Sequence, residues 1–200
     1  MRIVAIMLAA GQGSRFGGGK LLAKLADGTP VGIQSVRNLK QALTDIVAVT
    51  RPEDTDFRTL LHAEGIRVEI CPRAHEGMGA SLAHGVLATY DADAWIVALG
   101  DMPRIRPATI RQIAAVLAGG AHIVAPAYHG TRGLPVGFSG AFREALAALS
   151  GDTGARDILR AERSRVTLLD CDDPGVLADI DTPEDLARYN RTLDQERHTS

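Results

Sequence analysis

The sequence is poor in aromatic residues and in cysteine, and it has no long apolar run. Aromatics make up 4% of the 200 residues, so we expect an aliphatic core. Cys71 and Cys171 lie far apart and form no CxxC pair, which favours two free thiols and leaves a single disulfide as the alternative. The apolar stretch 1–10 is too short to span a bilayer and leads straight into glycines. We interpret it as a buried strand and not as a signal peptide.

The chain also lacks an excess of charge of either sign. It has 22 Lys+Arg against 24 Asp+Glu, a formal net charge of −2. A dedicated nucleic-acid binder usually carries a basic face, so we expect no nucleic-acid partner. Because the apolar stretch at 1–10 is interpreted as a buried strand, we also expect no membrane partner, and a cytoplasmic location follows by default. A small anionic ligand remains compatible, because a few arginines or lysines suffice to bind one phosphate group.

What the sequence does contain is a regular alternation of apolar strands and helices. The predicted strands cover 3–9, 45–49, 67–71, 94–99, 122–126 and 166–170. The predicted helices cover 30–42, 56–64, 80–90, 107–117, 141–149, 155–161 and 183–190. Alternation of this kind predicts right-handed crossovers and a mostly parallel sheet in one α/β domain. We assign the domain to residues 1–192, followed by a polar C-terminal tail at 193–200, which we expect to fray.

A glycine-rich loop follows the first strand, with the sequence LAAGQGSRFGGGK at 8–20. In an open α/β sheet, ligands bind outside the carboxyl ends of the strands. The glycines would let backbone N–H groups approach a polyphosphate, and Arg15 and Lys20 would supply positive charge. The loop matches neither the Walker A motif nor GxGxxG, and a flexible linker with solvated charges is the alternative.

A carboxylate follows the strand at 94–99, in the segment GDMP at 100–103. At this position Asp101 is well placed to hold Mg²⁺, which prefers one or two carboxylates together with substrate phosphates. A structural aspartate in a turn or at a helix cap is an equally weighted alternative.

The segment DIDTPEDL at 179–186 combines a helix start with two further carboxylates. Thr182 before Pro183, with Asp185 at the third helical position, forms a capping pattern. That pattern does not account for Asp179 and Asp181, which precede it. These two carboxylates could complete a metal site with the one at 101.

The motifs LAAG-x-G-S-R-F-G…K, GMGASL, GDMP, GDTGAR and DIDTPEDL occur in this order. Together they resemble the molybdenum-cofactor cytidylyltransferases, a branch of the MobA-like nucleotidyltransferases, over residues 3 to about 189. The resemblance implies a doubly wound, Rossmann-like fold whose seven-stranded, mostly parallel sheet has one reversed strand. It also implies a Mg²⁺-dependent enzyme that transfers CMP from CTP, or GMP from GTP, to the terminal phosphate of Mo-molybdopterin. A molybdoenzyme or its chaperone would then be a further partner.

The resemblance also assigns roles by position. Base and ribose contacts are expected from Leu8, Ala9, Ala10 and Gly11. Triphosphate contacts are expected from Gly13, Ser14, Arg15 and Lys20. The nucleotide side of the cleft would be completed by Gly77, Gly79 and Ser81. The catalytic set would be Arg15, Lys20 and Asp101, and the metal ligands would be Asp101 and Asp181.

Two positions bear on the substrates. Ala10 completes the LAAG of the cytidylyl branch, where the guanylyl branch has LAGG, so CTP is favoured over GTP. The G-x-x-G-x-P segment at 130–135 is expected to face the pterin phosphate, with Leu134 where family members often carry His. The predicted acceptor contacts are His129, Arg132, Gly133 and Arg156. For Arg156, a surface ion pair with Asp152 is an equal alternative.

Other functions share part of this pattern. Relatives with LAAG-x-G-x-R use other phosphorylated acceptors, such as methylerythritol phosphate, a sugar phosphate or phospholactate. A catalytically silent nucleotide- or pterin-binding module is the alternative from a different class, although retention of Lys20, Asp101 and Asp181 argues against it. The expected mechanism is direct attack of an acceptor phosphate on the α-phosphorus of CTP, without a covalent nucleophile.

Overall fold

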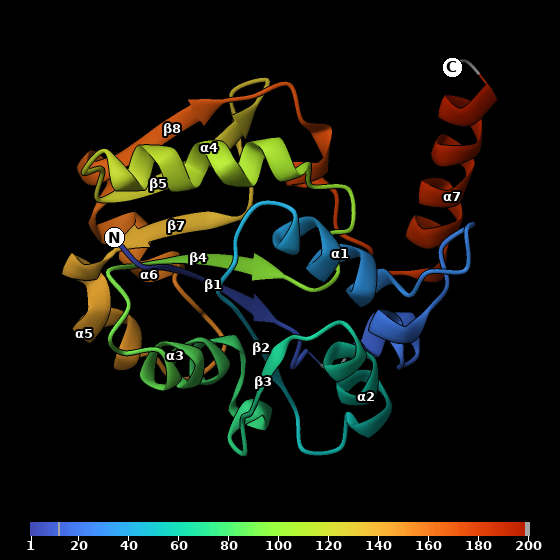
Figure 1. Ribbon diagram of the computed structural model, residues 1–200, viewed down its shortest axis with the longest axis horizontal. Coiled ribbons are helices and arrows are strands. Elements are labelled where there is room, and N and C mark those ends of the chain that lie inside the picture. The colour runs from blue at the N-terminus through green and yellow to red at the C-terminus, as the bar shows by residue number, and fades with distance from the viewer. Residues whose placement is uncertain (12, 199–200) are drawn as a thin grey trace.

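The computed structural model describes residues 1–11 and 13–198, and it contains one twisted sheet covered by helices on both faces (Figure 1). The strands are β1 Ile3–Leu8, β2 Ile46–Thr50, β3 Arg67–Ile70, β4 Ala94–Leu99, β5 Ile123–Tyr128, β6 Thr131–Arg132, β7 Val136–Ser139 and β8 Val166–Asp170. The α-helices are α1 Val31–Lys40, α2 Thr55–Ala63, α3 Met78–Ala88, α4 Pro107–Ala118, α5 Arg143–Ala147, α6 Arg156–Ala161 and α7 Pro183–His198. No helix in the described residues is long and apolar enough to cross a membrane.

The sheet has the order β3-β2-β1-β4-β7-β5, with β6 and β8 both paired to β5. β1, β2, β3 and β4 are parallel neighbours, and β8 runs parallel to β5. β7 is antiparallel to both β4 and β5. The expected mostly parallel sheet with a reversed strand is therefore confirmed. The two-residue β6 is antiparallel to β5, and with it the described sheet has eight strands, where the resemblance implies seven.

The direction of the strand order reverses at β1. β2 lies on one side of β1 and β4 lies on the other, and Leu8 pairs with Val49 and with Leu99. The chain segments that follow β1 and β4 therefore leave the same edge of the sheet side by side, joined by a hydrogen bond from the Gly100 N–H to the Leu8 carbonyl (3.0 Å). Such a reversal is where open α/β sheets bind ligands.

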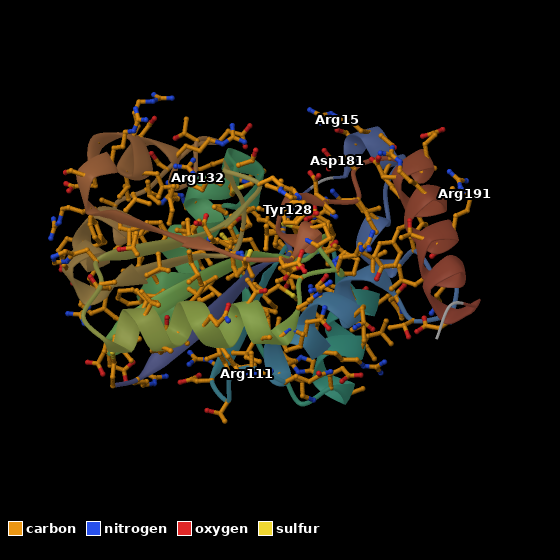
Figure 2. All side chains as sticks on the ribbon, turned by 90° about the horizontal axis from the view of Figure 1, so that it is seen from above. Arg15, Arg111, Tyr128, Arg132, Asp181 and Arg191 are labelled. Atoms are coloured by element: carbon orange, nitrogen blue, oxygen red, sulfur yellow. The ribbon has the colours of Figure 1, made fainter. Side chains whose placement is uncertain are left out.

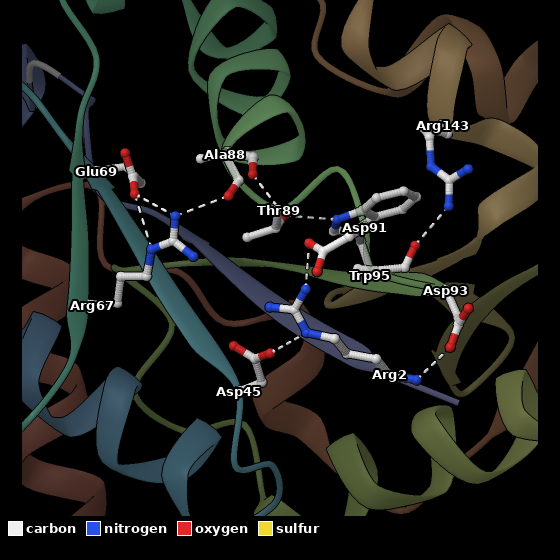
Figure 3. Close-up of polar contacts among 12 residues, drawn as sticks. Arg2, Asp45, Arg67, Glu69, Ala88, Thr89, Asp91, Asp93, Trp95 and Arg143 are labelled. Carbon is white, nitrogen blue, oxygen red and sulfur yellow. Dashed lines mark hydrogen bonds and ion pairs between the residues drawn. The ribbon is translucent and has the colours of Figure 1, made fainter.

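Alternate residues of each buried strand pack into two layers of core. One layer joins β1 residues such as Ile6 to α3, α5 and α6, and the other joins residues such as Met7 to α1, α2 and α4. Most of the core is aliphatic, as the composition predicts. Trp95 is fully buried and donates its indole N–H to Thr89 Oγ1 at 2.9 Å, which satisfies its polar atom (Figure 3).

The amino end of β1 is tied down by Arg2 (Figure 3). Its backbone N–H donates to Asp93 (2.6 Å), and its guanidinium contacts Asp45 (2.7 Å) and Asp91 (2.5 Å). These carboxylates belong to the segments that precede β2 and β4. The network therefore joins three neighbouring strands at the edge of the sheet opposite the glycine loop.

Besides shifts of one or two residues at element ends, such as that of α3, the structure differs from the predicted elements in three places. β6 and β7 lie in the segment 130–139, which shows no strand pattern because it contains three glycines and a proline. The predicted helix 141–149 is a 3₁₀ turn followed by the short α5, and α3 covers 78–88 instead of 80–90. The last helix was predicted to end at 190 and continues to 198, into the predicted tail; residues 199–200 lie outside the described part.

Candidate active site

The loop after β1 depends on glycine backbone conformations. Gly13, Gly17, Gly18 and Gly19 have φ angles of 59°, 85°, 95° and 64°, a region that L side chains rarely adopt. They allow two 3₁₀ turns, Ser14–Phe16 and Lys20–Leu22, within a short span. The chain thereby folds back on itself and returns the Lys20 side chain to the carboxyl ends of β1 and β4.

Lys20 lies between two carboxylates that are distant in sequence. Its Nζ is 2.6 Å from Asp101 Oδ2 and 2.9 Å from Asp181 Oδ1. The Lys20 and Asp101 side chains are only 13% and 16% exposed. Arg15 Nη1 lies 3.0 Å from Asp181 Oδ2, and Figure 2 shows these two side chains beside each other. The structure thus brings together Arg15, Lys20, Asp101 and Asp181 from three separate motifs.

The start of α7 positions Asp181. Thr182 Oγ1 accepts a hydrogen bond from the Asp185 N–H (3.2 Å), and Asp185 Oδ2 accepts from the Thr182 N–H (2.9 Å), which forms the predicted capping pattern. The Ile180 N–H donates to the Asp101 carbonyl at 3.0 Å, so the two acidic segments are joined directly. Ile180 and Tyr189 also pack against the segment between the glycine loop and α1. Figure 1 shows α7 beside this segment.

Burial and the neighbouring charges shift the pKa values of both Asp101 and Lys20. Burial raises the pKa of Asp101 above its ordinary value, while the Lys20 ammonium opposes the shift. Burial by itself would lower the pKa of Lys20, but the carboxylates of Asp101 and Asp181 outweigh it, and the pKa of Lys20 is raised. The centre is therefore a buried site in which negative charge favours a nearby cation.

The donor set fits a magnesium ion. Asp101 Oδ1 is buried and has no hydrogen-bond partner within the described residues, so one carboxylate oxygen remains available. The part of the chain that the structure describes contains no cluster of three or more His, Cys, Asp or Glu side chains that could hold a metal ion. Two carboxylates suffice for Mg²⁺, which takes its remaining ligands from substrate phosphates and water.

A cleft of about 580 Å³ opens beside this centre. Eight of the residues assigned to the nucleotide from the sequence line it, namely Leu8, Ala9, Ala10, Gly11, Gly13, Lys20, Gly77 and Ser81. Asp101, which was assigned to the metal, also lines it. Ser14, Arg15 and Gly79 do not line it. The first two lie on exposed 3₁₀ turn positions at the rim, and the third packs against another loop.

The GMGAS segment rests on the GDTGAR segment without space for side chains. The Gly79 N–H donates to the Gly151 carbonyl at 2.8 Å, and a Cβ on Gly79 would lie 2.6 Å from the Ser150 carbonyl oxygen. A Cβ on Gly77 would lie 2.6 Å from the Gly151 carbonyl oxygen. This contact brings Asp152 to the cleft, where the sequence had assigned it no role.

The wall formed by the end of β2 and the start of α2 was not predicted. Arg51, Glu53, Asp54 and Phe57 line the cleft there, and Arg51 Nη2 pairs with Asp54 Oδ1 at 2.7 Å. The signal was present, because TRPED follows a buried strand and therefore lies at the same edge of the sheet.

A second pocket of about 290 Å³ lies next to the cleft, and Leu99 lines both. Three predicted acceptor residues line it, namely Arg132, Gly133 and Arg156. Its other lining residues are Leu99, Met102, Leu134, Val136, Leu159, Val176, Leu177 and Asp179. Asp152 lines the cleft instead, and no ion pair joins it to Arg156 in the described part of the chain.

The structure places His129 outside both pockets. It lies in the tight turn between β5 and β6, with a φ of 48°, and its ring packs edge-on to Tyr128 with 4.2 Å between centroids. His129 is therefore a turn residue and does not line the second pocket.

Comparison with known proteins relates the whole chain to one family. A model of the MobA-like NTP transferase domain matches residues 5–166. The purine catabolism protein PucB of Bacillus subtilis is 28% identical over 202 residues, covering 96% of this chain and 97% of PucB. The nicotine blue oxidoreductase of Paenarthrobacter nicotinovorans is 29% identical and covers 93% of this chain and 95% of its own length.

A solved structure has the same fold over nearly the full length. Rv0371c from Mycobacterium tuberculosis H37Rv aligns with a TM-score of 0.82 and 28% identity, covering 96% of this chain and 98% of that one. A second structure of Rv0371c is a complex with manganese and aligns with a TM-score of 0.79 at 26% identity.

Proposed function

The chain belongs to the MobA-like NTP transferase family, and on this premise we propose that it is a cytidylyltransferase for the molybdenum cofactor. It would transfer CMP from CTP to the terminal phosphate of Mo-molybdopterin and release pyrophosphate. The observation that carries the proposal is the centre formed by Lys20, Asp101 and Asp181 at the reversal of strand order, between a nucleotide-sized cleft and a second, arginine-containing pocket.

The residues of the centre suit phosphoryl transfer by positioning and electrostatics. Backbone N–H groups of the glycine loop would bind the triphosphate, with Lys20 and Arg15 neutralising the leaving pyrophosphate. Asp101 and Asp181 would hold Mg²⁺, which when bound would neutralise charge on the reacting phosphates. An acceptor phosphate oxygen attacks the α-phosphorus, the bond to the bridging oxygen of the β-phosphate breaks, and pyrophosphate leaves with that electron pair.

The preference for CTP is proposed from Ala10. This residue is buried at the edge of the cleft, directly after β1, and its methyl group narrows the space that a base would enter. A pyrimidine needs less room than a purine at this place. The sequence pattern LAAG, typical of the cytidylyl branch, supports the same choice.

The acceptor is proposed from the second pocket. Arg132 and Arg156 supply two guanidinium groups, which suit bidentate phosphate recognition. Leu134, Val136 and Val176 supply an apolar wall for the remainder of the acceptor. A phosphate attached to a largely planar, uncharged ring system fits this combination.

The test is pyrophosphate release from CTP and from GTP with Mg²⁺, each with and without Mo-molybdopterin. Release from CTP that requires the pterin would support the nucleotide and the acceptor together. Methylerythritol phosphate and a sugar phosphate are assayed in parallel as acceptors. Release that requires one of them would change the proposed acceptor and leave the proposed reaction class unchanged. No release with any pair would overturn the proposal and favour a silent nucleotide-binding module, or an oxidoreductase, as one relative is named.

A further inference from the structure

β8 forms one outer edge of the sheet (Figure 1). It pairs with β5 along its whole length, from Val166 opposite Ile123 to Asp170 opposite Ala127, and within the described residues nothing pairs with its other side. An edge strand presents unpaired N–H and C=O groups that can join another strand.

The backbone direction of β8 follows from the hydrogen bond at its end. The Cys171 N–H donates to the Ala127 carbonyl at 2.9 Å, so the backbone groups of Cys171 point toward β5. In a parallel strand the backbone groups of alternate residues point to opposite sides. The N–H and C=O groups of Leu168 and Asp170 and the C=O group of Val166 therefore point outward, away from the sheet. The Val166 N–H is already used, because it donates to the Arg163 carbonyl at the end of the preceding 3₁₀ turn.

This edge lacks the usual protection against pairing. β8 has the sequence VTLLD, with no proline, no lysine and no bulge in its register with β5. Leu168 lies at its centre with 53% of its surface exposed, although leucine is usually buried. Val166 lies on the same face and packs on the core.

The two ends of β8 carry opposite charges. Arg163 and Arg165 precede the strand, and Asp170 and Asp172 end and follow it, all four at exposed positions. Within the described residues, Arg163, Asp170 and Asp172 form no side-chain hydrogen bond or ion pair. A strand of this kind complements an identical strand that runs in the opposite direction.

We propose that β8 is a self-association edge, through which two copies of this chain pair antiparallel about a two-fold axis at Leu168. The three outward-pointing residues then match, with Val166 opposite Asp170 of the partner subunit, and Leu168 opposite the partner's Leu168. The leucine pair exchanges two hydrogen bonds, and each Val166–Asp170 pair forms one, from the Asp170 N–H to the Val166 carbonyl. The leucine pair covers apolar surface, and the arginine end of each strand meets the aspartate end of the other.

The exposed leucine and the charged ends of β8 also specify the register in which the two strands pair. An axis at Thr167 or Leu169 would leave one outward-pointing residue of each strand unpaired and would move the leucines off the axis. A parallel arrangement would place like charges at the same end. Isologous two-fold contacts are the commonest form of self-association. An antiparallel pair centred on Leu168 is the arrangement that places the two leucines together and opposite charges at each end.

The first experiment uses charge exchange. Sedimentation velocity of the full chain, from micromolar to millimolar concentration, should show a reversible monomer–dimer equilibrium. The variants R163D/R165D and D170R/D172R each place like charges at both ends and should be monomeric. Mixed in equal amounts they should form a heterodimer, because their ends are again complementary. A mixture that stays monomeric while the natural chain dimerises would overturn the assigned edge.

The second experiment locates the axis. Leu168→Cys in a Cys171→Ser background should form an intermolecular disulfide under mild oxidation, because the two residues at the axis face each other. Leu87→Cys in the same background is the matched control, since Leu87 is similarly exposed (57%) but lies on α3 and not on the edge strand. Equal cross-linking of both variants, or a natural chain that is monomeric at every concentration, would contradict the proposal.

Discussion

Lys20 is the residue at which three separate sequence motifs meet. Its ammonium group lies between Asp101 and Asp181, so a change at either carboxylate alters both the charge and the geometry of the centre. The sequence placed Lys20 and Asp101 at this edge of the sheet because the carboxyl ends of neighbouring parallel strands converge there, and the resemblance to a family added Asp181. It could not show that an ammonium would bridge the two carboxylates, since this depends on how four glycines turn the loop.

We expect Asp101→Asn to lower kcat by about 10²–10³-fold, because it removes one charge from a preorganised electrostatic centre. The change preserves shape, so circular dichroism and the unfolding midpoint should be nearly unaltered. Pyrophosphate release measures the effect, and Asp157→Asn, at an exposed position on α6, is the control that should retain activity. Full turnover in the double variant Asp101→Ala, Asp181→Ala would rule out the metal assignment.

Arg132→Ala should raise the KM for the acceptor by about ten- to a hundredfold, since a hydrogen bond to a charged group contributes about 1.5–3 kcal/mol. The KM for CTP should stay unchanged, because Arg132 lines the second pocket and not the cleft. Arg111→Ala is the control, at a residue that Figure 2 shows on the opposite side of the molecule. A parallel rise in both KM values would contradict the assignment of separate pockets.

Among single residues, the acceptor set was the hardest to predict. Arg132 and Arg156 line the second pocket, whereas His129 is held by its tight turn outside it. A contact of His129 with the acceptor therefore stays a prediction without support from the pocket lining. The cleft wall at Arg51 and Phe57 was not predicted, although it follows a buried strand, because the segment TRPED contains no glycine-rich loop or recognisable ligand-binding motif.

At the level of elements, the contact between the start of α3 and the loop at 150–152 has no room for a side chain. Gly79→Ala should lower the free energy of unfolding by about 1–3 kcal/mol, because its Cβ would lie 2.6 Å from a carbonyl oxygen and the backbone must move. Denaturant titration measures this change. Leu87→Ala, at an exposed position of the same helix, should alter stability by less than about 0.5 kcal/mol.

An ion pair joins α1 to the end of α2. Hydrogen bonds from Arg37 hold the pKa of Glu64 below its ordinary 4.5, so the pair stabilises the fold above the unfolded pKa and this contribution is lost as pH falls through the folded pKa. Glu64→Gln should cost about 0.5–1 kcal/mol at pH 7, as for a partly exposed pair. The difference between the two proteins should vanish in acid. Urea unfolding at several pH values checks this, and a difference independent of pH would argue against an electrostatic origin.

The prediction of element boundaries succeeded where the apolar pattern was strong, and it failed where glycines were frequent. β4 and β8 have the predicted bounds, since both are continuous apolar-rich runs. β7 was missed because Gly137 weakens the pattern, yet that glycine is required by packing: a Cβ there would lie 2.6 Å from Leu117. A close approach between a strand and a helix is a property of the folded chain and is not visible in the local sequence.

At the level of the whole molecule, the reversal of strand order at β1 fixes where the cleft can lie. The alternation of strands and helices predicted a mostly parallel sheet, and the resemblance to a family predicted the reversed strand. The pairing of β7 between β4 and β5 could not be deduced from alternation alone, because an antiparallel strand within such a sheet breaks the crossover rule.

CTP with Mg²⁺ should stabilise the folded chain as a whole. At a hundredfold excess over its Kd, a ligand that binds only the folded state adds about 2.7 kcal/mol. For a chain of this size, each kcal/mol raises the Tm by about 2–4 °C. Differential scanning fluorimetry should show this rise for the natural chain and a much smaller one for Lys20→Met. An equal rise in both would contradict a role for Lys20 in binding the triphosphate.

Leu99 is shared by the cleft and the second pocket, and it lies two residues before Asp101. For the proposed reaction, this shared wall means that donor and acceptor can be bound at the same time. The kinetic scheme of that reaction would contain a ternary complex, in which the nucleotidyl group passes directly from donor to acceptor without a covalent intermediate on the protein.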